Sequence, residues 1–338
     1  MHTLLLDNDD VRANAPMAEL VSALEDAFGA YQRGDALMPA KSYIDLPKYN
    51  GDFRSMPAYL HVRGETTESG EQWDAAGIKW VNVHTDNADR GLPTVLGTMI
   101  YSDPETAFPL AIMDGRELTQ LRTGAAAAVA TDHLAISDAT SLGIVGAGVQ
   151  SYTQLKAIAA VRPIEEVVVA DQSAERVADF VDQFADRFDV RGGEIGEAAA
   201  CDVLSTVTPV ESPLVDRADV GEHTHINAIG ADAAGKHELD DQILLDAKLV
   251  IDDYEQTTHS GEINVPYGAG TLTDSDIHGA LGEIVVGEKL GREADDGLTV
   301  FDSTGLAIQD IAAAHVVYTE ATESDSGTAF DLLGLADA

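Results

Sequence analysis

The chain has little cysteine and little positive charge. Its 338 residues include one cysteine and 20 lysines and arginines, against 59 aspartates and glutamates. A single cysteine excludes an internal disulfide, and the apolar neighbours of Cys201 indicate a buried thiol rather than a reactive one. So few basic residues argue against nucleic acids and anionic membranes as partners, since both recruit clustered Lys and Arg.

The sequence also lacks a run of about 20 apolar residues, the length that crosses a membrane. Its first residues have neither the basic region nor the apolar core of a signal peptide. We therefore expect a cytoplasmic protein. The apolar fraction of 45% is enough for a packed interior, and the length suits two domains.

The net charge of -39 is spread along the whole chain rather than gathered in a tail. Such self-repulsion opposes a compact fold at low ionic strength. At molar salt the Debye length is only about 3 Å, so the repulsion is screened. The composition therefore favours a halophilic source over a specialised acidic binding surface, which would concentrate the charge in blocks.

The sequence has two regions with different patterns of predicted secondary structure. The first part predicts a helix over residues 7–33, a mostly antiparallel sheet and a helix over 117–135. The sheet strands are expected at residues 41–46, 55–62, 77–84 and 94–101.

After residue 141, apolar strands alternate with helices, which is typical of a doubly wound parallel sheet. These strands are expected at residues 142–145, 167–170, 203–207, 226–229 and 249–251. The fold class is therefore α/β, with residues 119–306 as a Rossmann-type domain. Residues 1–118 and 307–338 are expected to form a mixed α+β substrate-binding and dimerisation domain.

A glycine-rich turn follows the first parallel strand, in the run Gly146-Ala147-Gly148-Val149-Gln150. Gly146 would allow the tight turn, and Gly148 would let the backbone approach a pyrophosphate at the start of the next helix. Ser151 stands where the motif has its third glycine. The alternative is that these glycines serve packing alone.

Asp171 ends the second parallel strand, about 20 residues after the glycine turn, where a carboxylate binds the adenosine ribose. A carboxylate there favours NAD, because it would repel the 2'-phosphate of NADP. Thr206 and Thr208 end another strand and are candidate cofactor contacts, although an ordinary strand end is an equally good explanation.

Some charged residues stand in apolar surroundings. Strand alternation places Lys79 on one face with Val81 and Val83, so its ammonium needs an anionic partner unless it reaches solvent at a strand edge. Arg122 is flanked at helical spacing by leucine and alanine, so a buried guanidinium there must also pair with an anion. Arg54 stands in similar apolar surroundings. Asp232 follows a strand and reaches the edge where ligands bind, unless it is a surface loop residue.

Several motifs in order along nearly the whole chain are similar to those of the ornithine cyclodeaminase/mu-crystallin family. They are Gly77-Ile78-Lys79-Trp80-Val81-Asn82, Arg122-Thr123-Gly124-Ala125-Ala126, Gly146-Ala147-Gly148-Val149-Gln150, Gly230-Ala231-Asp232 with Gly235-Lys236, and Ser303-Thr304-Gly305-Leu306-Ala307. The resemblance implies a homodimer, a Rossmann domain and NAD held against a small amino acid or its 2-oxo acid.

The resemblance also implies roles for individual residues. Lys41, Lys79 and Arg122 match residues that hold the substrate carboxylate, and Asp232 matches the catalytic acid or base. Lys79 is a second candidate for proton transfer. Cofactor contacts are implied for Thr123 and Ser303, besides Gly146, Gly148, Val149, Gln150, Asp171, Thr206 and Thr208.

One position departs from the cyclodeaminases, which have a glutamate two residues before the Met-Pro that matches Met56-Pro57. This chain has Arg54 there, as do the archaeal alanine dehydrogenases that it resembles, and Arg54 is expected to hold the substrate carboxylate together with Lys41, Lys79 and Arg122. The sequence thus predicts NAD-dependent oxidation of L-alanine to pyruvate and ammonia, and the reverse. Ornithine cyclodeamination and a non-catalytic, mu-crystallin-like NAD(P)H-binding role remain the alternatives.

Overall fold

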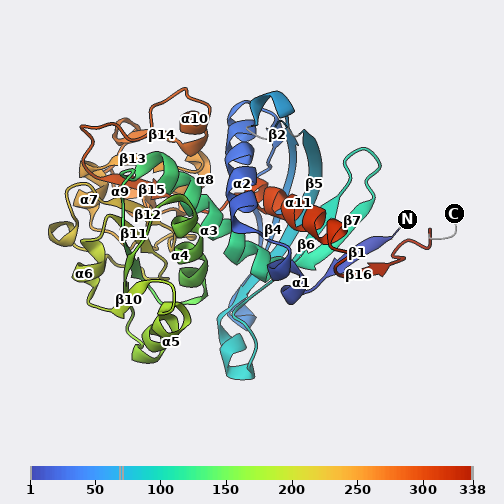
Figure 1. Ribbon diagram of the computed structural model, residues 1–338, viewed down its shortest axis with the longest axis horizontal. Coiled ribbons are helices and arrows are strands. Elements are labelled where there is room, and N and C mark those ends of the chain that lie inside the picture. Colours follow the sequence, from blue (N-terminus) through green and yellow to red (C-terminus); the bar gives the residue numbers. More distant parts are fainter. Residues whose placement is uncertain (1, 68–69, 71, 336–338) are drawn as a thin grey trace. The chain divides into compact units, whose positions relative to one another are not determined.

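The computed structural model describes residues 2–67, 70 and 72–335, and it divides the chain into two compact units (Figure 1). Unit 1 contains residues 1–122 and 306–338, and unit 2 contains residues 123–305. The boundaries expected from the sequence lie after residues 118 and 306. The boundary after residue 122 falls inside helix α3 (Gly115–Leu134), so no break in secondary structure marks it.

Unit 1 is built on a mixed sheet in the order β16-β1-β7-β6-β5-β4-β2, with β3 paired to β4. The β1–β7 pair is parallel, and the other described pairs are antiparallel. The mostly antiparallel sheet expected here is thus confirmed. Its strands are β1 (Thr3–Leu6), β2 (Ala36–Leu37), β3 (Ser42–Leu46), β4 (Gly51–Val62), β5 (Trp73–His84), β6 (Val95–Ser102), β7 (Pro109–Asp114) and β16 (Thr328–Phe330).

The helices of unit 1 correct one expectation. Instead of one helix over residues 7–33, the chain forms α1 (Asn8–Ala13) and α2 (Met17–Gln32), with Pro16 between them. Proline has no N–H to donate and disfavours a helical conformation in the residue before it, so the helix stops and restarts. The other helices of this unit are the first two turns of α3 and α11 (Ala307–Glu323).

Helix α11 packs across β4, β5 and β6 and against α2 (Figure 1). The covered face of the sheet carries Met56 of β4 opposite Lys79 of β5, and Lys79 opposite Met99 of β6. All three side chains are buried. Gly77 permits the close approach of α11, because a Cβ there would lie 3.0 Å from Cδ1 of Ile311 and 2.5 Å from the carbonyl oxygen of Ile100.

Unit 2 is built on a parallel sheet in the order β10-β9-β8-β11-β12-β15-β13-β14, as expected for a Rossmann-like domain. Its strands are β8 (Ser141–Val145), β9 (Glu166–Ala170), β10 (Asp189–Gly192), β11 (Val203–Thr206), β12 (His225–Ala228), β13 (Lys248–Ile251), β14 (Ile277–Ala280) and β15 (Thr299–Asp302). Its helices, besides most of α3, are α4 (Val149–Val161), α5 (Ala174–Phe184), α6 (Ile195–Ala199), α7 (Asp241–Asp246), α8 (Tyr254–Ser260), α9 (Asn264–Ala269) and α10 (Leu281–Val285).

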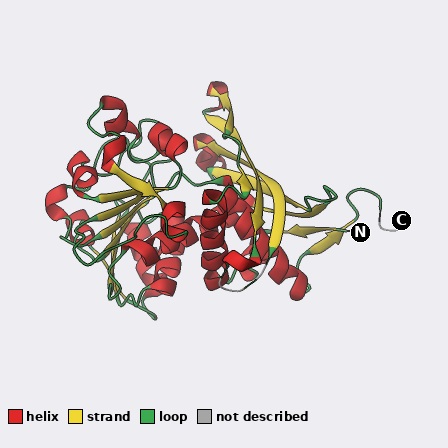
Figure 2. Cartoon of the chain, turned by 90° about the horizontal axis from the view of Figure 1, so that it is seen from above, coloured by secondary structure: helices red, strands yellow, loops and turns green. Residues whose placement is uncertain are grey.

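Both faces of the parallel sheet are buried beneath helices (Figure 2). Alternate residues of one strand enter different cores: Val145 belongs to one cluster, and Leu142 and Ile144 belong to the other. Because both faces are covered, the inner strands are largely apolar, which is why five strands were predicted from the sequence. Strand order reverses between β8 and β11, the position at which such sheets bind ligands.

Candidate active site

The glycine turn after β8 has the backbone that its sequence requires. Gly146 has a φ of +104°, and a Cβ there would lie 2.9 Å from Cγ2 of Thr208. Gly148 is the N-cap of α4, no side chain caps this helix end, and a Cβ at Gly148 would meet nothing within 4 Å. The N-terminus of α4 therefore presents backbone N–H groups and open space to an anion such as a pyrophosphate.

Asp171 lies directly after β9 and reaches back to the glycine turn. Its Oδ2 accepts a hydrogen bond from the N–H of Ala147 at 2.8 Å, and its Oδ1 accepts one from Ser173 at 2.8 Å. Each oxygen keeps lone-pair capacity for a ribose hydroxyl. The Oε1 atom of Gln150, in the first turn of α4, is buried and has no hydrogen-bond partner among the described residues. These features fit a dinucleotide.

The ends of β11 and β12 are held by Glu238, a buried carboxylate that the sequence analysis did not find. It accepts hydrogen bonds from the hydroxyls of Thr206 and Thr208 at 2.8 and 2.7 Å, and from the N–H groups of Thr208 and Gly230 at 2.7 and 2.9 Å. Both threonine hydroxyls thus donate within the protein, and their contact with a cofactor stays a prediction.

Two further carboxylates, Glu262 and Asp302, are buried beside Glu238. Glu262 accepts hydrogen bonds from the N–H groups of Glu238 and Leu239, and Asp302 accepts them from Glu262 and Ile263. Burial raises the pKa of Glu238, and it raises the pKa values of Glu262 and Asp302 well above their usual range. In the described part of the chain no lysine or arginine pairs with these three carboxylates, which accept hydrogen bonds from backbone N–H groups and threonine hydroxyls.

Asp232 and Ser303, two other candidates, also lie in unit 2. The Asp232 side chain is 40% exposed and forms an ion pair with Lys236. The side chain of Ser303 is buried, and its hydroxyl donates to Asp252. Thr123 is buried as well, and its carbonyl oxygen accepts a hydrogen bond from Gln154 of α4. Asp232 is therefore the most accessible of the three side chains.

In unit 1, Lys79 is buried in an ion pair. Its Nζ lies 2.7 Å from Oδ1 of Asp310 on α11 and 3.1 Å from Oγ1 of Thr119 on α3. The side chains of Lys79 and Asp310 are each only 1% exposed. The sequence predicted that the Lys79 ammonium would need an anionic partner, and Asp310 is that partner.

Arg122 shares the same carboxylate oxygen. Its Nε lies 3.1 Å from Oδ1 of Asp310, and its Nη1 donates to Oε1 of Gln309 at 3.0 Å. Nη2 of Arg122 and the third N–H of Lys79 have no partner among the described residues. Two cations and one carboxylate leave one positive charge uncompensated, together with N–H donors in the fork geometry that a carboxylate ligand accepts.

The environment of Lys79 suits proton transfer. Burial lowers the pKa of Lys79 to about 7, although the Asp310 carboxylate acts in the opposite direction; Arg122 and Lys41 add to the lowering. Lys41, one residue before β3, is thus close enough to Lys79 to affect its charge. A lysine with a pKa near neutrality can both bind and release a proton under ordinary conditions.

Arg54 lies on the same face of the sheet as Met56 and is paired to a neighbour. Its Nε and Nη2 each lie 2.9 Å from Oδ2 of Asp52, and its guanidinium stacks 5.6 Å from the ring centre of Tyr43. Both charged side chains are largely buried. Asp52 therefore compensates the charge of Arg54, a partner that the sequence analysis did not anticipate.

Comparisons with known proteins identify the family of the chain. The family model of the ornithine cyclodeaminase/mu-crystallin family matches residues 1–325. The chain belongs to this family. It is 46% identical over 331 residues to alanine dehydrogenase of Archaeoglobus fulgidus, covering 97% of this chain and 98% of that protein.

Solved structures of the family are similar throughout. An archaeal alanine dehydrogenase dimer with bound NAD has a TM-score of 0.91 and 45% identity, covering 98% of this chain and all of the other. The Thermococcus litoralis Delta(1)-pyrroline-2-carboxylate reductase, in complex with NADH and L-proline, has a TM-score of 0.89 and 35% identity, covering 96% and 99%. NAD in one or other redox state is thus bound in both relatives.

Asp310 and Gln309 are the residues of this family member that sequence reasoning missed, although a signal was present. The segment Ala307-Ile308-Gln309-Asp310-Ile311 contains a carboxylate among apolar residues of a helix. The reasoning applied to Lys79 and Arg122, that a buried charge needs a partner, applies equally to Asp310. Pairing the three would have required a match between α11 and a strand more than two hundred residues earlier.

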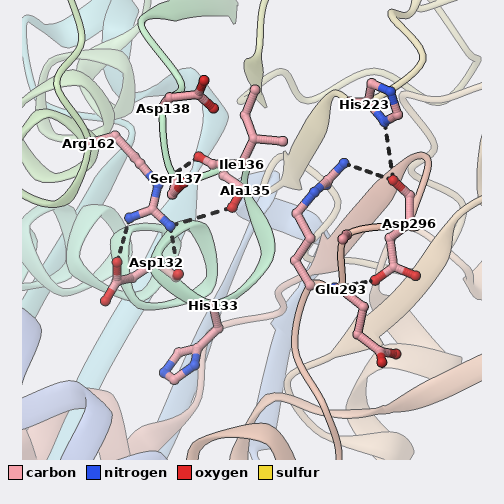
Figure 3. A pocket seen from close by; sticks show the side chains of 12 residues that line it. Asp132, His133, Ala135, Ile136, Ser137, Asp138, Arg162, His223, Glu293 and Asp296 are labelled. Carbon is pink, nitrogen blue, oxygen red and sulfur yellow. Dashed lines mark hydrogen bonds and ion pairs between the residues drawn. The ribbon is translucent and has the colours of Figure 1, made fainter.

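A cavity of about 490 Å³ in unit 2 lies away from the candidate residues (Figure 3). Its lining residues precede β8, β12 and β15, so it is at the amino edge of the sheet, whereas Asp171 and Asp232 follow strands. The guanidinium of Arg162 donates to carbonyl oxygens of Asp132 and Ile136, and Arg292 donates to that of Leu134. These arginines cap the end of α3, which is a structural role in this fold.

No helix in residues 2–67, 70 and 72–335 is long and apolar enough to span a membrane. Within the same residues, no group of three His, Cys, Asp or Glu side chains is arranged to hold a metal ion. Cys201 is buried, and burial raises the pKa of its thiol to about 11.

Proposed function

We propose that this chain is an NAD-dependent alanine dehydrogenase. It converts L-alanine, NAD⁺ and water into pyruvate, ammonium, NADH and a proton, and it catalyses the reverse reductive amination. The observation that carries the proposal is the excess positive charge of the Lys79–Asp310–Arg122 cluster. The similarity to alanine dehydrogenase of Archaeoglobus fulgidus over 97% of the chain supports the choice of reaction.

In this reaction the cationic cluster binds the carboxylate of the amino acid. The unused Nη2 group of Arg122 and the third N–H of Lys79 supply charge-assisted hydrogen bonds in surroundings from which most water is excluded. The bound carboxylate is fixed in orientation, which also fixes Cα. With a pKa of about 7, Lys79 can in addition take up or release a proton as the amine becomes an imine.

The cofactor residues fit NAD, which accepts the hydride from Cα when it is bound. The N-terminus of α4 and Gly148 receive the pyrophosphate, and the Asp171 carboxylate accepts hydrogen bonds from the ribose hydroxyls. The same carboxylate repels a 2'-phosphate, so we expect NAD to be preferred over NADP. Val149, Gln150, Thr123 and Ser303 are retained as proposed cofactor contacts.

Asp232 is proposed to act as the acid or base that activates water for attack on the imine carbon. Its exposure distinguishes it from Glu238 and Asp302, which are fully buried and hydrogen-bonded to backbone N–H groups. Lys236, its ion-pair partner, favours the ionised form that accepts a proton from water.

A short side chain is the proposed specificity. Arg54 replaces the glutamate with which a cyclodeaminase meets the second ammonium group of ornithine. Because Asp52 compensates Arg54, its guanidinium repels the second ammonium group of ornithine less than an uncompensated cation would. The Asp52 carboxylate is already paired with Arg54, so it offers no acceptor to the second ammonium group of ornithine. That ammonium would be desolvated without a hydrogen-bond partner, which disfavours binding.

The test is a substrate panel. The enzyme is incubated in concentrated KCl with NAD and each amino acid, NADH is followed at 340 nm, and products are analysed for pyruvate and proline. We expect NADH and pyruvate from alanine. Proline from ornithine without NADH, and no reaction with alanine, would overturn the proposal. Oxidation of NADH by Delta(1)-pyrroline-2-carboxylate but not by pyruvate with ammonium would assign the chain to its reductase relatives.

A homodimer is the proposed assembly, formed through the face of the unit 1 sheet that α11 does not cover. This face exposes apolar side chains of β3, β5 and β6: Ile44, Trp80, Leu96 and Ile100. A second copy of the chain is the proposed occupant, and the alanine dehydrogenase relative with bound NAD is a dimer. Trp80→Glu with Ile100→Glu should convert a dimer of 35.7 kDa chains to monomers in light scattering. Leu290→Glu, a change at a more exposed apolar residue of unit 2, should not, and a monomeric wild type would refute the assembly.

A further inference from the structure

The carboxylate of Asp310 is the unexplained member of the cationic cluster. It comes from α11, and it is enclosed together with Lys79 and Gln309. Its Oδ1 receives both Nζ of Lys79 and Nε of Arg122, at 2.7 and 3.1 Å. Its Oδ2 is buried without a hydrogen-bond partner among the described residues. Both cations are therefore held on one oxygen, although a second oxygen is available.

This sharing has an electrostatic consequence. Two cations on one acceptor lie close to each other, and without an anion between them their repulsion in a dry environment would separate them or remove a proton from the lysine. Asp310 acts against both effects, since its negative charge favours the ammonium form of Lys79 while Arg122 and Lys41 disfavour it. Thr119 contributes a neutral acceptor only.

The packing of α11 fixes where this oxygen lies. Ile311, the next residue, approaches the sheet at Gly77, two positions from Lys79 on the same strand. Gln309, the preceding residue, receives Nη1 of Arg122 on Oε1. The amide of Gln309 cannot be turned, because its NH₂ group would then face the guanidinium. Residues on both sides of Asp310 thus lock its carboxylate against the two cations.

We propose that Asp310 is a positioning residue, which holds the ammonium of Lys79 and the guanidinium of Arg122 side by side on one oxygen so that their outward donors meet the substrate carboxylate together. The inference rests on the proposed function for the identity of that substrate. It does not require Asp310 to touch the substrate.

The test separates the charge of Asp310 from its shape. Asp310→Asn keeps an acceptor oxygen and loses the charge, so Lys79 should titrate at lower pH than in the wild type. Lysine labelled with ¹³C at Cε reports this titration by NMR without any turnover, and the signal is assigned by its absence in Lys79→Met. In the pH profile of kcat/KM, the limb that reflects titration of Lys79 should also move to lower pH. Asp310→Ala, which removes the acceptor too, should raise KM for alanine at least tenfold.

Glu117→Gln is the matched control. Glu117 is also buried in unit 1, lies on α3 and accepts an ion pair from Arg12 at 2.9 Å. Its change should leave the Lys79 titration, KM and kcat as in the wild type. An unchanged Lys79 titration in Asp310→Asn overturns the proposal, whatever the substrate. If Asp310→Asn does not fold, Asp310→Glu decides it: a carboxylate displaced by one methylene should also move the titration, and an unmoved one overturns the proposal.

The two proposals fail separately. A wild-type enzyme that leaves alanine unchanged refutes the dehydrogenase assignment, while the NMR titration still tests the role of Asp310. A shifted titration with unaltered KM in Asp310→Ala would mean that Asp310 sets the charge of Lys79 without aligning the two cations, and the positioning role would be wrong.

Discussion

The two units bury their charges in opposite ways. In unit 1, Lys79 and Arg122 share one carboxylate, so positive charge is in excess. In unit 2, Glu238, Glu262 and Asp302 are buried together, and no lysine or arginine among the described residues pairs with them. The first cluster leaves N–H donors unused, whereas the second uses its oxygens on backbone N–H groups and threonine hydroxyls.

This difference separates binding from support. An excess of cations with unused donors attracts an anionic ligand, so the unit 1 cluster is incomplete by itself. The acidic cluster of unit 2 is complete, because backbone dipoles and raised pKa values remove the need for an external cation. A surplus of buried charge thus indicates a ligand only where donors or acceptors remain free.

The largest effect is expected from removing the cation of unit 1. Lys79→Met should lower kcat about a thousandfold through loss of proton transfer and carboxylate binding, with NAD affinity unchanged. Measurement is by NADH formation at 340 nm and by titration of NAD fluorescence quenching. A variant that retains a tenth of wild-type turnover would contradict the role of Lys79.

Lys79→Met also tests how the buried lysine affects the pH dependence of the free energy of unfolding. Because the pKa of Lys79 is lowered from 10.5 to about 7 in the folded state, the unfolded chain binds more protons between these values. The free energy of unfolding of the wild type should therefore rise as pH increases from about 7 towards 10.5. Lys79→Met should lack this component, as measured by urea unfolding at several pH values.

Asp232→Asn should lower kcat about a hundredfold, as expected for loss of one acid or base. Its exposure means that the melting temperature should stay within a degree or two of the wild type. Asp246→Asn, an exposed carboxylate of the same unit that pairs with Arg217, is the control and should keep full activity. Equal activity in both variants would remove Asp232 from the mechanism.

The acidic cluster is tested by Glu238→Ala, which leaves four N–H and O–H donors of the strand ends without their acceptor. We expect a loss of about 2 kcal/mol of unfolding free energy and weaker NAD binding, because the loops after β11 and β12 lose their common anchor. Glu238→Gln should lose less, since its amide oxygen still accepts. A fall in kcat at saturating NAD with no loss of stability would mean that this cluster belongs to the chemistry instead.

Salt should have the smallest effect on the two buried clusters and a measurable effect on the melting temperature. Raising KCl from 0.1 to 2 M screens the dispersed surface charge, so the melting temperature should increase by several degrees. Buried pairs are screened much less, so the Lys79 titration should remain in place. A melting temperature independent of KCl would refute the halophilic interpretation of the composition.

Much of this fold was readable in the sequence, because apolar runs and their spacing report burial directly. Five parallel strands and the strands β3, β4, β5 and β6 of unit 1 overlap the residues where strands were expected, whereas β7 was missed. Strand β15, fully buried in the middle of the sheet, was also missed, although it is as long as β11, β12 and β13, which were expected. The edge strand β10 was missed because its residues are mostly polar or exposed.

The site was readable in its parts and not in its pairings. Lys79 and Arg122 stood out as charges in apolar text, and Asp171 followed from its distance to the glycine turn. Asp310 and Asp52 were not found, because a partner is defined by tertiary contact and not by local pattern. Arg54 is an example. The sequence marked it as a charge in apolar surroundings without naming its partner, and in the structure Asp52 compensates it.

The position of Asp310 in the sequence has a consequence for synthesis. It follows Lys79 by 231 residues, so at ordinary ribosome speeds the carboxylate is made roughly 10–50 s after the lysine. All of unit 2 lies between these two residues in the sequence, so it is synthesised before α11. A nascent or truncated chain that ends before residue 306 therefore exposes the apolar face of β4–β6 and a lysine without its anion.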